Sequence, residues 1–161
     1  MRHHWGMIDA LTRWPLRLAA RGAHGLWRGW RRFAGVRLFG AHAVAITPRG
    51  GIVLVRLRYA RGWRLPGGGR AESEDPRAAV LRELEEEIGL VSHGEVRAVS
   101  TAEGTARAAS EEDSLFIVRD VEYRPRWSFE VEELAEFPLD RLPEALSETA
   151  RQWIEQARPL L

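Results

Sequence analysis

Residues 68–90 read GGRAESEDPRAAVLRELEEEIGL, and this stretch decides how the rest of the chain is interpreted. Asp75 and Pro76 are typical of a helix start, because Asp favours the N-cap and Pro the first helical position. Gly89 stands where a glycine commonly ends a helix. The sequence therefore predicts a helix over residues 76–88.

The predicted helix carries three acidic side chains along one border. At 100° per residue, Glu83, Glu86 and Glu87 fall within an arc of about 100°, beside the apolar face that carries Val80 and Leu84. Such a run is by itself commonly a solvated helix face. Like charges at these spacings repel, however, so a folded domain tolerates them best with a cation between them. Carboxylates clustered without His or Cys suit Mg²⁺ or Mn²⁺ rather than zinc.

A glycine-rich turn at 66–69 precedes the helix and would let backbone approach anionic oxygens closely, although alone it is equally consistent with an ordinary loop. Turn and helix together match the pattern G-x5-E-x7-R-E-U-x-E-E-x-G-U, with U aliphatic, at every fixed position. The matching residues are Gly68, Glu74, Arg82, Glu83, Leu84, Glu86, Glu87, Gly89 and Leu90. On these residues the chain resembles the Nudix hydrolase family, and flanking segments extend the likeness to about residues 36–158.

The resemblance implies an α/β fold, an α/β/α sandwich around a mixed β-sheet. It also implies a hydrolase that uses Mg²⁺ or Mn²⁺ to cleave the pyrophosphate bond of a nucleoside diphosphate linked to another moiety. Glu83, Glu86 and Glu87 would bind the metal with the carbonyl of Gly68. Arg82 would orient these glutamates, Glu74 would support the site, and Glu83 or Glu87 would activate the water. Some members take the base from a later loop, so further candidates are Glu103, Glu111, Glu112, Glu130 and Glu133.

Two positions depart from what many family members carry. Ala71 replaces a frequent glutamate, and Ser73 replaces a glycine before Glu74. Neither position belongs to the defining pattern. The departures therefore bear on the geometry of the loop rather than on the metal site.

We call the matching stretch, residues 68–90, the Nudix box. Three residues ahead of this box are candidates for binding substrate, namely Tyr59, Trp63 and Arg64. The two aromatic rings would stack a nucleobase, and the alternative for both is packing in the core or at its rim. The expected partner is a small nucleotide derivative. Its class is left open, because the residues that read base or sugar lie in loops such as 59–64, 103–113 and 124–133.

Outside the box, alternating and apolar runs predict the remaining elements. These are a β-hairpin with strands over 36–47 and 52–58, strands over 95–101 and 114–123, a short apolar run near Phe137, and a helix over 147–158.

The composition narrows the chemistry further. The chain has 161 residues, enough for one domain, and a net charge of +1, which argues against a globally basic nucleic-acid binder. It contains no Cys, so disulfides, thiolate nucleophiles and zinc–cysteine sites are excluded. Neither a P-loop nor a Gly-x-Ser-x-Gly motif is present, and the five His show no metal-ligand spacing. With no transmembrane or secretory signal, we expect a cytoplasmic protein.

Charge and aromatic residues concentrate at the beginning of the chain. Residues 1–40 contain eight Arg and one acid, and four of the seven Trp. We therefore divide the chain into a basic leader over 1–35, helical or partly disordered, and a Nudix domain over 36–161. The leader has three interpretations: packing or disorder, a helix in the plane of a membrane surface through residues 1–33, or an arm that contacts RNA or substrate. The sequence leaves the oligomeric state undecided.

The alternative to an enzyme is a module of the same fold that binds a nucleotide metabolite without hydrolysing it and is tethered by the leader. The intact set Arg82, Glu83, Glu86 and Glu87 argues against it, because a module without catalysis has no need for a costly carboxylate cluster.

Overall fold

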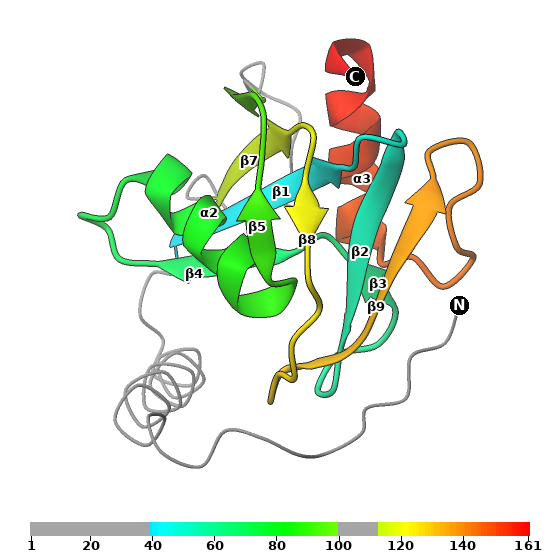
Figure 1. Ribbon diagram of the computed structural model, residues 1–161, viewed down its shortest axis with the longest axis horizontal. Coiled ribbons are helices and arrows are strands. Elements are labelled where there is room, and N and C mark those ends of the chain that lie inside the picture. The colour runs from blue at the N-terminus through cyan, green and yellow to red at the C-terminus, as the bar shows by residue number, and fades with distance from the viewer. Residues whose placement is uncertain (1–38, 100–112) are drawn as a thin grey trace. The chain divides into compact units, whose positions relative to one another are not determined.

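A mixed β-sheet forms the centre of the fold (Figure 1). The computed structural model describes residues 39–99 and 113–161. Strand β1 (Phe39–Ile46) pairs antiparallel with β2 (Gly51–Leu57) and parallel with β7 (Asp113–Val118). β1 and β2 form the predicted hairpin, with Ala45 opposite Val53.

Further strands complete this sheet and form a second, small one. In the main sheet, β3 (Trp63–Arg64) and β9 (Val131–Pro138) pair with β2, β4 (Gly67–Arg70) with β1, and β6 (Val96–Ala98) with β7, all antiparallel. The second sheet consists of β5 (Leu90–Ser92) and β8 (Glu122–Tyr123).

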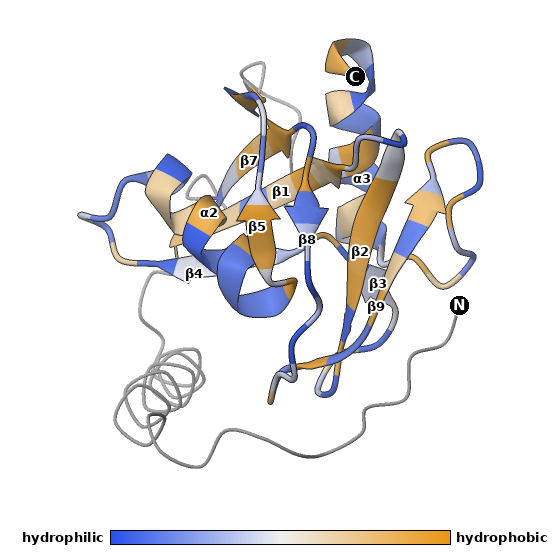
Figure 2. Ribbon diagram, in the orientation of Figure 1, coloured by the Kyte–Doolittle hydropathy of each residue, from blue (hydrophilic) through white to orange (hydrophobic). Residues whose placement is uncertain are grey.

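Two helices cover opposite faces of the main sheet. Successive residues of a strand point to opposite faces, and Ala43 packs in a cluster with Leu84 of α2 (Pro76–Glu87), whereas Val44 packs with Ile154 of α3 (Glu148–Ala157). Figure 1 shows α2 in front of the sheet and α3 behind it. A short 3-10 turn, η1 (Arg158–Leu160), follows α3. The central strands are apolar on both faces and appear hydrophobic along their length in Figure 2.

The predicted α/β fold around a mixed sheet is thus confirmed, as are both helices within one residue at each end. Two local predictions were wrong. The strand expected over 114–123 is interrupted because Asp120 adopts a left-handed backbone with φ of 53°, which separates β7 from β8. The turn expected at 66–69 is largely strand β4, whose glycines lie along the first half of β1.

Some predictions fall outside the described residues. They concern the basic leader over 1–35 and the loop glutamates Glu103, Glu111 and Glu112. In the ranges that are described, neither helix is long and apolar enough to cross a membrane.

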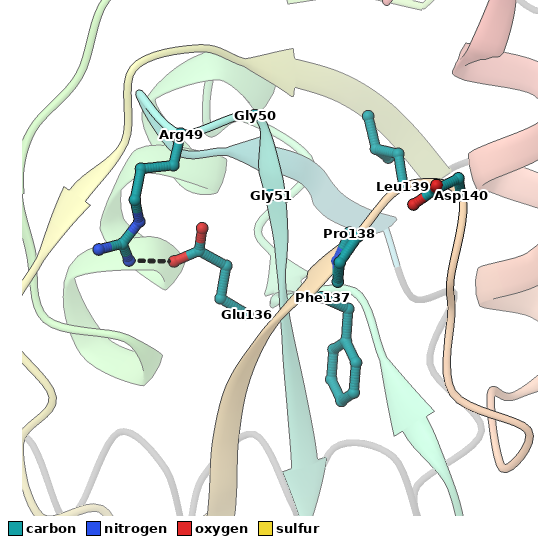
Figure 3. Close-up of a pocket in the computed structure, with 8 residues that line it drawn as sticks. All are labelled: Arg49, Gly50, Gly51, Glu136, Phe137, Pro138, Leu139 and Asp140. Atoms are coloured by element: carbon teal, nitrogen blue, oxygen red, sulfur yellow. Dashed lines mark hydrogen bonds and ion pairs between the residues drawn. The ribbon is translucent and has the colours of Figure 1, made fainter. Parts of the chain in front are cut away.

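The turn between β1 and β2 is tied to β9 by one carboxylate. Thr47 Oγ1 donates to Oε1 of Glu136 at 2.7 Å, and Arg49 donates to Oε2, as Figure 3 shows for Arg49. The hydrogen bond from Arg49 lowers the pKa of Glu136 below its ordinary value of 4.5; partial burial opposes this shift and the bond from Thr47 adds to it. The charged form of Glu136 is therefore the form that the fold stabilises.

We predict that Glu136→Gln lowers the free energy of unfolding at neutral pH. The pKa of Glu136 is lower in the folded protein than in the unfolded chain. The stability that ionised Glu136 contributes is therefore present above pH 4.5 and is lost as the pH falls through the lowered pKa. Urea unfolding from about pH 7 to about pH 3 should show the deficit shrinking with acid. Glu144→Gln is the matched control, since Glu144 is exposed and has no ion pair within the described ranges. A deficit independent of pH would contradict the interpretation.

Candidate active site

Helix α2 begins and packs as its sequence predicts. The side chain of Asp75 accepts hydrogen bonds from the backbone N–H groups of Arg77 and Ala78, and Pro76 follows it. The apolar face of the helix lies on the sheet, with Val80 and Leu84 fully buried. This orientation turns the acidic border toward β4, and the C-terminal part of the helix is hydrophilic in Figure 2.

Two of the carboxylates are held against the glycines of β4. The backbone N–H of Gly67 donates to Oε2 of Glu87 at 2.8 Å. A Cβ atom at Gly68 would lie 2.8 Å from Oε2 of Glu83, so only glycine leaves room for that carboxylate. Glu83 is 1% exposed and Glu87 7% exposed, an unusual burial for acidic side chains. The glycines of β4 therefore set the position of both groups.

Arg82 connects the carboxylates to one another. Its Nε and Nη2 donate to the two carboxylate oxygens of Glu74, at 2.9 and 3.1 Å, a bidentate contact. Its Nη1 donates to Oε1 of Glu83 at 2.8 Å and lies 3.7 Å from Oε1 of Glu86. Nη2 also contacts the carbonyl oxygen of Gly69 at 3.3 Å.

Arg82 keeps its charge in this setting. Burial by itself lowers the pKa of Arg82. The hydrogen bonds to Glu74 and Glu83 and the charges of both carboxylates raise the pKa, and together they outweigh the effect of burial, so the net shift is upward. A permanently charged, planar guanidinium is suited to fix two carboxylates at once. Lysine would offer a single point charge in its place.

Four carboxylates gather around the guanidinium of Arg82 and the glycines of β4. One guanidinium is shared by Glu74, Glu83 and Glu86, and Glu87 adds a fourth carboxylate. The last turn of α2 holds no basic residue, and acids at the C-terminal end of a helix oppose its dipole. These electrostatics and the oxygen donors fit a hard divalent cation.

The carboxylates of the cluster point to different partners rather than to one common point. Over 39–99 and 113–161, no three acidic or His side chains are arranged so as to hold a metal ion as they stand. Glu83 and Glu87 are each turned to a different partner, the former to Arg82 and the latter to Gly67. The donor set therefore fits Mg²⁺ or Mn²⁺ in its chemistry, while the side chains in this geometry serve hydrogen bonds.

The three predicted substrate residues lie in different surroundings. Trp63 is 7% exposed and packs edge-to-face on Phe137 in the core beside α3, which is the packing alternative that the sequence left open for this ring. Arg64 pairs with Val55, which packs beneath α2, and therefore points to the face that carries the box. Tyr59 is 59% exposed in the turn after β2.

Arg64 lies within the described ranges without an anionic side chain as its partner. In the described part of the chain it makes no hydrogen bond or ion pair, and its Nε is buried. It lies three residues before Gly67, whose N–H holds Glu87. A guanidinium placed this way is available to an anionic ligand.

The two described loop glutamates lie at the start of β9. Glu133 pairs with Arg56 at 3.3 Å, and Glu130 accepts a backbone hydrogen bond from Arg58 through its carbonyl. Arg56 itself lies over the ring of Trp63, which packs in the core beside α3. The structure thus gives Glu133 a partner of its own and brings neither glutamate into contact with Arg82.

A pocket of about 670 Å³ lies apart from the box (Figure 3). It opens at the turn between β1 and β2, where Arg49 meets Glu136. Ala41, which pairs with Gly68, is six residues away along β1 from Thr47, about 20 Å at 3.3 Å per residue. The pocket is therefore separate from the carboxylate cluster.

Comparison with known proteins agrees with the sequence pattern. A family model described as the NUDIX domain matches residues 37–157. The chain belongs to the Nudix hydrolase family. The cluster built around Arg82 lies within the Nudix box, and α2 is the Nudix helix.

Two curated relatives match part of the chain. Nudix hydrolase 26, chloroplastic, of Arabidopsis thaliana is 42% identical over 64 residues, which cover 40% of this chain and 27% of the relative. The RNA pyrophosphohydrolase of Acidiphilium cryptum is 51% identical over 54 residues, or 30% of this chain and 33% of the relative. The chain thus spans about a quarter to a third of the length of these relatives.

Solved structures show the same fold over a larger share. A MutT NUDIX hydrolase from Burkholderia pseudomallei superposes with a TM-score of 0.59 at 28% identity, covering 74% of this chain and 96% of that protein. An ADP-ribose pyrophosphatase from Streptococcus suis reaches a TM-score of 0.55 at 22% identity, covering 76% and 93%. The second likeness concerns the fold alone.

Removing the guanidinium should destabilise the Nudix box. We predict that Arg82→Ala lowers the free energy of unfolding by about 2–4 kcal/mol, because the buried carboxylate of Glu83 loses its counter-charge. Adding Glu83→Gln should restore part of the loss. Urea unfolding would measure both, with Arg77→Ala on the exposed side of α2 as the control, expected within about 0.5 kcal/mol of wild type. Equal effects of Arg82→Ala and Arg77→Ala would contradict the assignment.

Proposed function

We propose that the protein is a metal-dependent hydrolase that cleaves the pyrophosphate bond of a nucleoside diphosphate linked to another moiety. The observation that carries the proposal is the buried, Arg82-anchored carboxylate cluster between α2 and the glycines of β4. Burying carboxylates is costly, and this fold nevertheless gathers four of them around one guanidinium, an arrangement of oxygen donors that suits a divalent cation. Membership of the Nudix hydrolase family supports the same activity.

The proposed metal ligands are Glu83, Glu86 and Glu87, with the carbonyl oxygen of Gly68. A bound Mg²⁺ or Mn²⁺ would neutralise pyrophosphate oxygens and lower the pKa of a coordinated water. Arg82 and Glu74 act as positioning residues, since their bidentate contact fixes the guanidinium that holds Glu83.

Glu87 is the proposed general base. One oxygen of Glu83 accepts from the guanidinium of Arg82, and one oxygen of Glu87 accepts from the backbone N–H of Gly67 beside the metal ligands proposed above. In the proposed reaction Glu87 takes a proton from water as the water oxygen bonds to phosphorus. The bond from phosphorus to the bridging oxygen breaks, and that oxygen leaves with the second phosphate.

Arg64 is the proposed contact for a substrate phosphate. It points to the face of the sheet that carries the Nudix box and has no internal carboxylate partner within the described ranges. A guanidinium can bind two phosphate oxygens at once. This role retains one of the three substrate residues predicted from the sequence.

The alternative is a Nudix-fold module that binds a nucleotide without hydrolysing it. Such a module has no use for the strained acidic border of α2, which the observed burial of Glu83 and Glu87 makes more costly. The two functions differ in a simple observation. The enzyme requires divalent metal for turnover, and the module binds nucleotide without turnover.

Turnover should depend on divalent metal and on Glu87. With Mg²⁺ or Mn²⁺ we expect phosphate or nucleotide release from one class of nucleoside diphosphate derivative, abolished by EDTA. Glu87→Gln should reduce kcat by about 100-fold or more while circular dichroism stays unchanged, because the side chain no longer accepts a proton. Glu85→Gln, on the exposed side of the same helix, is the matched control and should keep wild-type turnover.

Two results would count against this mechanism. Wild-type turnover by Glu87→Gln at saturating Mg²⁺ would remove Glu87 as the base. If the folded wild-type protein turns over none of the nucleoside diphosphate derivatives tested but still binds nucleotide, the binding module is favoured.

Arg64→Ala should raise KM by about 10-fold and change kcat less, because a charge-assisted contact to a phosphate is lost in the bound ground state as well as in the transition state. Arg64→Lys should recover part of the affinity. Arg97→Ala, at an exposed position on β6, serves as the control for a change of net charge. An unchanged KM in steady-state kinetics of Arg64→Ala would exclude the phosphate contact.

A further inference from the structure

An exposed aromatic pair lies in the segment between β8 and β9. Trp127 is 64% exposed and Phe129 70% exposed, and their rings meet edge-to-face with centroids 4.1 Å apart. Large apolar side chains at this exposure leave most of their surface in water, which is costly unless they have a ligand. We call Trp127 and Phe129 the aromatic platform.

The backbone around the platform is held in place. Ser128 Oγ accepts hydrogen bonds from the N–H groups of Glu130 and Val131, both at 3.2 Å. The N–H of Arg58 donates to the carbonyl of Glu130, which joins the segment to the end of β2. The backbone that carries the platform is therefore already fixed, so a ligand would bind there without the cost of ordering this segment.

The same segment is attached to the end of the Nudix helix. The N–H of Arg124 donates to the carbonyl of Gly89, two residues after Glu87. A Cβ atom at Gly89 would collide with the carbonyl of Arg124 and would lie 3.5 Å from Cγ of Arg126. These contacts connect the platform to the carboxylate cluster through a few residues of chain.

Two arginines, Arg124 and Arg126, and one acid, Glu130, flank the platform along the chain. Arg124 and Arg126 are exposed, and neither makes an ion pair within 39–99 and 113–161. The nearby acids Glu132 and Glu133 are paired with Arg56. Aromatic rings next to unpaired arginines are the combination that binds bases by stacking and phosphates by charge.

We propose that Trp127 and Phe129 stack the nucleobase of the substrate while Arg124 and Arg126 attract its phosphates, so that the platform selects base-bearing substrates for the Nudix box. The inference rests on the proposed function, since it names what the same site recognises. The base comes either from a mononucleotide or from the 5′ end of a short RNA. Both present the same chemistry, and the test separates them.

The test compares ligands with and without a base. Binding of an α,β-methylene nucleoside diphosphate, a 5′-diphosphorylated trinucleotide and base-free methylenediphosphonate is measured by calorimetry on the full chain with Mg²⁺. The double variant Trp127→Ala/Phe129→Ala should lose about 5- to 150-fold in affinity for a base-bearing ligand and keep wild-type affinity for methylenediphosphonate. Trp127→Phe should recover most of the loss, and Val91→Ala, at another exposed apolar position, is the control.

Each outcome decides the proposal. A loss for both nucleotides supports a platform for the first base, and a loss for the trinucleotide alone supports one for a later base of an RNA. Unchanged affinity for both overturns it, as does an equal loss for the base-free probe. A changed sedimentation coefficient with unchanged affinity would make the patch a surface for self-association instead. Loss of turnover in Glu87→Gln tests the Nudix box separately, so failure of either proposal is recognisable.

Discussion

The contacts of Arg82 with Glu74 and Glu83 hold the Nudix box together. Glu83 is almost completely buried, and a carboxylate taken out of water without a counter-charge would either protonate or unfold its surroundings. The guanidinium supplies that charge and fixes the direction of the carboxylate. The same contact joins the loop before α2 to the helix, because Glu74 precedes the helix start at Pro76. Geometry and electrostatics of the site thus depend on one side chain.

The sheet positions the other half of the site. β4 pairs with the first half of β1, and its glycines let backbone lie directly against α2. The N–H of Gly67 and the missing side chain of Gly68 each accommodate one carboxylate. Because β1 is packed on both faces, β4 has a rigid neighbour. The pairing of β1 with β4 therefore links the apolar core, in which β1 packs, to the acidic cluster, which lies against β4.

Much of this arrangement could be predicted from the sequence, and the remainder depended on tertiary contacts. The start of α2 at Asp75 and the acidic border of Glu83, Glu86 and Glu87 follow from local preferences and helical periodicity. For Trp63 the sequence left stacking and core packing open, because the choice depends on pairing with β2 and on contact with Phe137. The sequence named loop 124–133 among those that could read base or sugar, but it did not single out the aromatic platform. The run RPRWSF at 124–129 signals rings and charge together, but only the contact with Gly89 connects it to the Nudix helix.

The central proposal is that the acidic border of α2 binds a divalent cation. Anomalous diffraction from a crystal soaked in Mn²⁺ tests this most directly, because it locates the ion without reference to activity. We predict one strong anomalous peak beside the carboxylates of Glu83, Glu86 and Glu87, and its loss in crystals of Glu83→Gln. A soaked crystal with no peak there, or with the same peak in the variant, would contradict the account.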